Sequence, residues 1–215
     1  MTFINSVYEY NPQTEVWTQK ADMPTARSGG AAGVIDSKIY VAGGRPPHGP
    51  DFAVFDPTAD TWTVLPDLPT RRNHLAVTAI GGKLYVAGGR FGGGVGSEMT
   101  DRLEIFDPAE VGWSAGAPLL ERRAGLNGVA ANGCFYTFGG EGNDPHPLGV
   151  FPNSEVYDPT ADAWTRLEPI PIPVHGVTGS AFVDGWIHLP GGGTSRGGGS
   201  GSTVHQVFVP PISCQ

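Results

Sequence analysis

The sequence has little cysteine and no long hydrophobic run. Only Cys134 and Cys214 are present among 215 residues. Cys134 falls inside a predicted strand and Cys214 in the tail, so we expect no disulfide bond and regard a reducing compartment as acceptable. No apolar stretch approaches the length of a membrane span, and the N-terminus shows no charged-then-apolar signal sequence. The sequence therefore predicts a cytoplasmic protein without a membrane partner.

Positive charge is also scarce. The formal net charge is −8, which argues against nucleic acid as a partner because phosphate binding needs a basic surface. The 33 glycines and 20 prolines exclude a helical protein, and they lack the three-residue period of collagen. The composition favours many short strands joined by tight turns, in a single domain over 1–215 with a substantial core.

The most informative feature is a repeat with a period of about fifty residues. Four times, an Asp-Pro or Asn-Pro turn is followed five residues after the proline by tryptophan, and then 26 or 27 residues later by Gly-Gly. The tryptophans are Trp17, Trp62, Trp113 and Trp164, and the glycine pairs begin at Gly43, Gly88, Gly139 and Gly191.

Each unit reads as four short strands, A to D. Strands A and B are separated by a pair of residues that tolerates the positive φ angles of a type I′ hairpin, so they are predicted to be antiparallel neighbours. Strand B ends at Gly-Gly, strand C precedes the Asp-Pro turn, and strand D carries the tryptophan. A C–D pair is predicted at 5–20, followed by units at about 27–65, 72–116, 123–168 and 175–210.

The repeated four-stranded unit resembles the blade of a Kelch β-propeller. The residues that carry the resemblance are the glycine pairs, the aromatic-Asp-Pro segments, the tryptophans, Tyr40, Tyr85, Tyr136, Arg27, Arg72 and Arg123. The resemblance implies an all-β fold of four four-stranded antiparallel blades, closed as a small ring or forming part of a larger propeller. We expect a closed monomeric ring, rather than a homo-oligomer. Either strands 5–20 complete the last blade and the C-terminal strand Val204–Phe208 is redundant, or this C-terminal strand displaces the N-terminal one.

Hairpin geometry places the D–A and B–C loops at one end of the molecule, which we call the loop face. Nine of the ten arginines fall there, and arginine offers a planar fork for carboxylate or phosphate. We expect three repeat arginines and a histidine to occupy equivalent places around the channel mouth. The candidate ligand-binding residues are Arg27, Arg72, His74, Arg123, His175, Arg45, Arg90 and Glu141. A structural alternative is that the repeat arginines only fix the D–A turn by hydrogen bonds.

Motifs for metal or cofactor chemistry are not recognisable. The six histidines have no helix-type metal spacing, and the acidic segment Glu141 to His146 is interpreted as a solvated loop. The Gly-rich B–C loops lack the spacing of a phosphate loop. The sequence therefore predicts no metal and no cofactor.

These observations predict a non-catalytic binding module that takes an acidic peptide, protein segment or charged glycan on the loop face. The alternative is a carbohydrate-active enzyme of the sialic-acid epimerase or isomerase type, because such enzymes are also Kelch propellers. In that case His175 or Glu141 serves as acid or base in the same mouth. The alternative rests on fold analogy.

Overall fold

The computed structural model describes residues 3–45, 51–94, 96–176 and 179–214, and this part of the chain contains strands but no helix. The strands are short, which follows from the turn residues that interrupt the sequence every few positions. They are β1 (Val7–Asn11), β2 (Val16–Lys20), β3 (Ala31–Ile35), β4 (Lys38–Ala42), β5 (Phe52–Asp56), β6 (Thr61–Val64), β7 (Ala76–Ile80), β8 (Lys83–Ala87), β9 (Leu103–Asp107), β10 (Gly112–Gly116), β11 (Asn127–Ala131), β12 (Cys134–Phe138), β13 (Ser154–Asp158), β14 (Ala163–Leu167), β15 (Ala181–Val183), β16 (Trp186–Pro190) and β17 (His205–Phe208).

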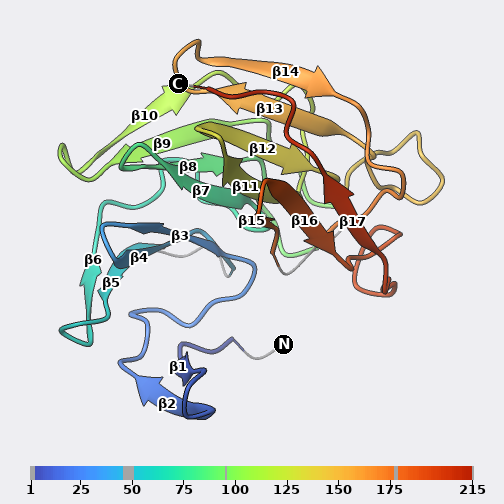
Figure 1. Ribbon diagram of the computed structural model, residues 1–215. Coiled ribbons are helices and arrows are strands. Elements are labelled where there is room, and N and C mark those ends of the chain that lie inside the picture. Colours follow the sequence, from blue (N-terminus) through green and yellow to red (C-terminus); the bar gives the residue numbers. More distant parts are fainter. Residues whose placement is uncertain (1–2, 46–50, 95, 177–178, 215) are drawn as a thin grey trace.

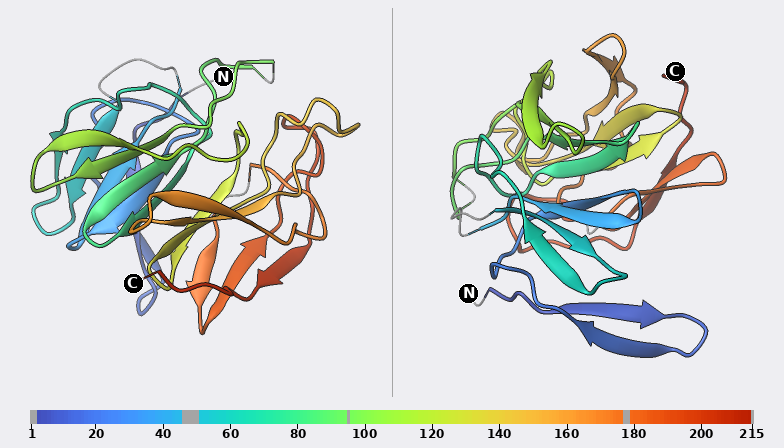
Figure 2. Two further views of the ribbon diagram at one scale, coloured as in Figure 1. Left: turned by 90° about the horizontal axis from the view of Figure 1, so that it is seen from above. Right: turned by 90° about the vertical axis from the view of Figure 1, so that its left-hand side faces the viewer.

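The strands form antiparallel sheets that fan around a common axis (Figures 1 and 2). Blade 1 is β3–β6, blade 2 is β7–β10, blade 3 is β11–β14, and blade 4 is β15–β17. The innermost strands β3, β7, β11 and β15 lie next to one another in that order. This arrangement confirms the all-β propeller. Three blades have the predicted four strands, and blade 4 has three among the described residues.

The A–B hairpins confirm the predicted turn chemistry. Both central residues have positive φ, for example 48° at Asp36 and 61° at Ser37, or 51° at Asn132 and 77° at Gly133. Such turns match the twist of the strands that they join. Glycine, asparagine and aspartate adopt this conformation at low cost, so their presence allowed the turns to be predicted from the sequence.

Gly-Gly at the end of strand B joins each blade to the next one. The second glycine donates its N–H to a carbonyl oxygen at the start of the following blade, from Gly44 to Arg72 at 2.9 Å and from Gly89 to Arg123 at 2.8 Å. A Cβ on Gly43 would lie 2.6 Å from the same Arg72 oxygen. The close approach of two backbones therefore requires glycine there.

The tryptophan of each complete blade contacts the segment that follows the preceding sheet. Each indole N–H donates to a backbone carbonyl in the segment that leaves the preceding sheet. The bonds run from Trp62 to Ala21 at 2.8 Å, from Trp113 to Pro66 at 2.9 Å and from Trp164 to Ala117 at 2.8 Å. In the N-terminal hairpin β1–β2, Trp17 remains 64% exposed, since no sheet precedes this hairpin in the described part of the chain.

The C-terminal strand, rather than the N-terminal hairpin, belongs to blade 4. β17 pairs with β16 and takes the third strand position of blade 4. The hairpin β1–β2 forms a sheet of its own beside blade 1 (Figure 2). The C-terminal strand therefore takes the place in the last blade, as in the second of the two expected arrangements, and strands 5–20 do not complete that blade. β16 and β17 are near each other in the sequence, so their pairing closes only a short loop. Pairing with the N-terminal hairpin would join the two ends of the chain, which costs more conformational entropy.

The C-terminal tail corrects the cysteine prediction. Beyond β17 the chain turns back to blade 3, where Cys214 forms a disulfide bond with Cys134 on β12. The tail is also held by a hydrogen bond from the Tyr136 hydroxyl to the Ile212 carbonyl at 2.7 Å. Both cysteines are buried. The two residues are 80 positions apart, so the sequence held no local signal of their proximity.

Candidate functional site

The repeat arginines lie inside the blades. The Arg72 side chain is 0% exposed. It donates to the Gly88 carbonyl at 2.6 Å and the Val86 carbonyl at 3.0 Å, and it forms an ion pair with Glu104. Burial lowers the pKa of Arg72, and the Glu104 carboxylate opposes that shift. All these partners belong to the same blade, so the side chain stabilises the blade.

Arg123 repeats this arrangement in blade 3 and is also 0% exposed. It donates to the Gly139 carbonyl at 2.6 Å and the Thr137 hydroxyl at 3.1 Å, and its ion pair with Glu155 spans 3.0 Å. Arg27 of blade 1 is half-buried and binds the equivalent Gly43 carbonyl at 2.9 Å. Burial removes Arg72 and Arg123 from the set of residues that can meet a ligand.

His175 does not occupy the arginine position of blade 4. The N–H of Gly140 donates to the carbonyl of Val174, as the equivalent glycines donate to Arg72 and Arg123. Val174 is therefore the structural counterpart of the repeat arginines. On strand C, the position of Glu104 is taken in blade 4 by Gln206. Blade 4 has thus lost both members of the buried ion pair.

His175 instead belongs to a cluster at the channel mouth with Glu141, Arg90 and His74. Glu141 is 1% exposed and forms an ion pair with Arg90 across the boundary between blades 2 and 3. Its other carboxylate oxygen accepts the N–H of Gly197 at 3.0 Å and lies 3.7 Å from Nδ1 of His175. The carboxylate thereby links the loops of three blades.

Hydrogen-bond partners define the proton positions in this cluster. Nε2 of His175 lies 2.7 Å from the Ser195 carbonyl, which only accepts, so that nitrogen carries a proton. Nε2 of His74 lies 3.1 Å from Nη2 of Arg90, which only donates. Nδ1 of His74 therefore carries its proton and donates to the Asn73 amide oxygen at 2.6 Å. These contacts fix the orientation of both rings.

His74 is held in its neutral form. Burial, followed by the positive charges of Arg90 and Arg45, lowers its pKa to about 4. Its backbone is also unusual, since φ is +55°. The equivalent residues of the other blades are glycines at φ between 59° and 68°, namely Gly29, Gly125 and Gly176.

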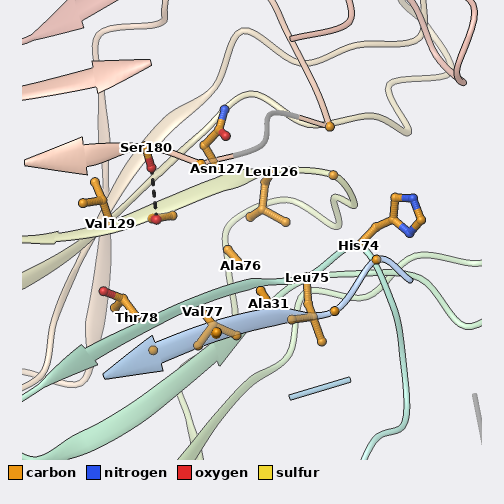
Figure 3. Close-up of a pocket in the computed structure, with 18 of the residues that line it drawn as sticks. Ala31, His74, Leu75, Ala76, Val77, Thr78, Leu126, Asn127, Val129 and Ser180 are labelled. Carbon is orange, nitrogen blue, oxygen red and sulfur yellow. Dashed lines mark hydrogen bonds between the residues drawn. The ribbon is translucent and has the colours of Figure 1, made fainter. Parts of the chain in front are cut away.

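The same four residues form a chain of backbone hydrogen bonds around the mouth. The N–H of His74 donates to Gly29, Gly125 donates to His74, and Gly176 donates to Gly125, each at 2.7 Å. Inside this lip lies a cavity of about 750 Å³, lined by the inner strands of the blades. His74 lies at one end of it, and Thr78 and Val129 lie at the other (Figure 3).

Replacing His74 by glycine is expected to reduce the loss of stability in acid. With a folded pKa of about 4 against about 6.5 unfolded, His74 binds a proton preferentially in the unfolded state. Its contribution to stability is therefore present above pH 6.5 and is lost as the pH falls toward 4. After allowance for solvent screening, the loss is about 2 kcal/mol.

Urea unfolding of wild type and His74→Gly at pH 7.5 and pH 4.5 measures this difference. The native φ suits glycine, so the variant should fold normally. An equal loss of stability in both proteins on acidification would contradict the assignment of a neutral His74.

Arg45 lies at the same mouth and has no carboxylate partner among the described residues. Its Nε donates to the Ser28 hydroxyl at 3.1 Å, and its Nη1 donates to the Gly93 carbonyl at 2.9 Å. A guanidinium has five N–H donors, so three remain unbonded within the described ranges. Arg45 is only partly buried, and these donors can meet a ligand.

Several other charged loop groups form ion pairs. Asp144 forms an ion pair with Arg196 at 2.7 Å, and Glu141 points to Arg90. Across the part of the chain that the structure describes, no group of three or more histidine, cysteine or acidic residues could hold a metal ion. Likewise, no helix there could cross a membrane.

The structure brings His74, Arg90, Glu141 and His175 together and places Arg45 beside them. Sequence reasoning missed the supporting groups, which are the Asn73 side chain, the Ser195 carbonyl and the Gly197 N–H. The two backbone groups carry no residue-type signal. Asn73 could have been noticed because it precedes a histidine at a position where the repeat has glycine.

Comparison with known proteins establishes the family. Residues 2–193 match the KLHDC2/KLHL20/DRC7 Kelch-repeats domain. The chain belongs to the Kelch-repeat family.

Similar proteins include the Kelch-like protein terF of Aspergillus terreus, which is 31% identical over 94% of this chain and 34% of its own length. Kelch-like protein 15 of Danio rerio is 31% identical over 87% of this chain and 34% of its own length. The chain thus spans about a third of the length of these relatives. The solved structure of YjhT has the same fold, with a TM-score of 0.77 and 18% identity over 96% of this chain and 73% of that one.

Proposed function

We propose that this Kelch propeller is a binding module for an acidic protein segment, which it holds at the channel mouth through Arg45. The observation that carries the proposal is the set of unbonded N–H donors on Arg45, which faces no carboxylate in the described residues. Charge-assisted bonds from arginine to carboxylate are short and strong. An acidic side chain supplies the missing partner.

The surroundings of Arg45 support this proposal. Arg90 and Glu141 form a pair with no net charge, and His74 is neutral at physiological pH because its pKa is about 4. The positive charge of Arg45 is therefore not cancelled within the mouth cluster. The backbone bonds between blades hold the mouth rigid, which reduces the entropy lost on binding.

A protein partner is supported by membership of the Kelch family, which is an argument by analogy. Nothing in the geometry favours the alternative of a sugar epimerase. Glu141 is almost completely buried, and each of its oxygens already accepts a hydrogen bond, from Arg90 and from Gly197, so the carboxylate is poorly placed to reach a substrate.

A fluorescent octaglutamate peptide tests the proposal by anisotropy, with octaglutamine as the neutral reference. We expect Arg45→Gln to weaken binding about tenfold, since a hydrogen bond to a charged group contributes roughly 1.5–3 kcal/mol. Lys38→Gln is the matched control, because Lys38 lies at the A–B turn, at the opposite end of the blade. An equal loss in both variants, or preferential binding of a sialylated glycan over octaglutamate, would refute the proposal.

A further inference from the structure

Two histidines occupy positions of blade 4 that hold apolar or aromatic residues in the first two blades. His188 on β16 corresponds to Tyr40 and Tyr85, since each is the third residue of strand B. His205 on β17 corresponds to Phe52 and Leu103, the first residues of strand C. The aromatic and aliphatic residues are buried in the cores between successive blades.

In blade 4 the equivalent face is uncovered in the described structure. Side chains alternate between the two faces of a strand, so Trp186 and Val207 share a face with the two histidines. Trp186 is 49% exposed and Val207 is 45% exposed. His205 is exposed and His188 is half-buried, so the two imidazoles do not fill a core.

The two rings are close enough to bind one metal ion. Nδ1 of His188 lies 3.0 Å from Nε2 of His205, and the ring centroids are 5.1 Å apart. Zinc–nitrogen bonds of 2.0–2.1 Å at a tetrahedral angle place two ligand nitrogens roughly 3.3 Å apart. Side-chain rotation that moves the two nitrogens apart by a few tenths of an ångström, and turns both lone pairs toward a common point, converts the present contact into a chelate.

We propose that His188 and His205 form a two-histidine site for a divalent transition metal, with Zn²⁺ as the reference ion. Imidazole is the ligand that suits zinc, copper and nickel, whereas the hard ions calcium and magnesium prefer oxygen. Water completes the coordination sphere, because no third histidine, cysteine or acidic ligand lies within reach among the described residues. Antiparallel pairing of β16 and β17 sets the distance between the ligands.

The site differs from the mouth cluster in its place and its chemistry. It lies on the face of the blade 4 sheet that corresponds to the faces buried between successive blades in blades 1 and 2. The mouth cluster lies on the loop face. The bond between the two imidazoles requires one donor and one acceptor, and a metal replaces that shared proton with two coordinate bonds. Metal binding therefore releases one proton or rearranges a tautomer.

Isothermal titration of chelator-treated full-length chain with zinc chloride tests the site. We expect saturable binding of one Zn²⁺ per chain, and a loss of affinity of about tenfold or more in His188→Gln or His205→Gln, because direct ligands matter at least as much as their outer-shell partners. His146→Gln is the matched control, since His146 lies in a loop of blade 3 and bonds to the Leu148 amide.

Fluorescence quenching by copper provides a second test, which does not rely on the heat signal of the titration. Cu²⁺ bound at the pair should quench the fluorescence of Trp186, and this quenching should disappear in the double variant His188→Gln with His205→Gln. Thermal melts check that the variants fold. Equal zinc affinity in wild type and double variant, or no saturable binding in the wild type, would overturn the proposal.

Discussion

Replacing Arg123 by alanine is expected to destabilise the protein by about 3–5 kcal/mol, because it leaves the buried carboxylate of Glu155 with only the half-exposed guanidinium of Arg166, 4.0 Å away, as a counter-charge. Both side chains are 0% exposed, and their ion pair spans 3.0 Å. The Gly139 carbonyl would also lose the donor at 2.6 Å. Urea unfolding at pH 7 measures the change. Arg122→Ala is the control. The Arg122 side chain is 65% exposed, so its removal should lower the free energy of unfolding by less than about 0.5 kcal/mol.

Blade 4 supplies the compensating change for this experiment. It carries Val174 in place of the arginine and Gln206 in place of the glutamate. Gln206 satisfies its amide by two bonds of 2.9 Å to the Ile172 backbone. The double variant Arg123→Val with Glu155→Gln should therefore recover most of the stability lost in the single variant Arg123→Val. A double variant as unstable as Arg123→Val alone would show that the charge of Glu155 is not the cause.

Loss of the Cys134–Cys214 bond should lower the free energy of unfolding by about 4 kcal/mol, because the bond restricts the unfolded chain across a long loop. The two residues are separated by 80 positions. Chemical unfolding with and without reductant measures this difference, and Cys134→Ala with Cys214→Ala is the matched variant. Reductant should have no further effect on the variant.

An unchanged stability of the wild type under reductant would contradict this prediction. The result also bears on location. The cytoplasmic location predicted from the sequence implies reduced thiols, because glutathione and thioredoxin reduce most cytosolic disulfides. A free-thiol assay on protein from its native compartment would distinguish the oxidised from the reduced form.

The strand order could be predicted because each unit is built from local signals. The A–B turns, the Gly-Gly pairs and the tryptophans each lie within a few residues of the strand that they position. Repetition then fixed the register, and the structure agrees at Asp36, Asn132 and Trp62. Local chemistry repeated several times is a strong predictor in repeat proteins.

Contacts between distant segments could not be predicted in this way. The Cys134–Cys214 bond, the pairing of β16 with β17 and the contact of His188 with His205 depend on how the chain returns across the ring. The one-residue shift that puts Val174 in the arginine position became visible only through backbone hydrogen bonds.

The candidate site was predicted in part for the same reason. The sequence identified the loop face, since hairpin connectivity fixes which loops share an end. It left open whether the repeat arginines, such as Arg72, are buried or accessible, because that depends on the partners that the fold supplies.

The most direct measurement of the binding proposal is hydrogen exchange in the presence and absence of the octaglutamate peptide. We predict slower exchange of amides near Arg45 and His74 on the loop face, and unchanged exchange at the A–B turns 36–37, 81–82 and 132–133. Protection at those turns, with no change near Arg45, would contradict the assignment of the binding site to the channel mouth.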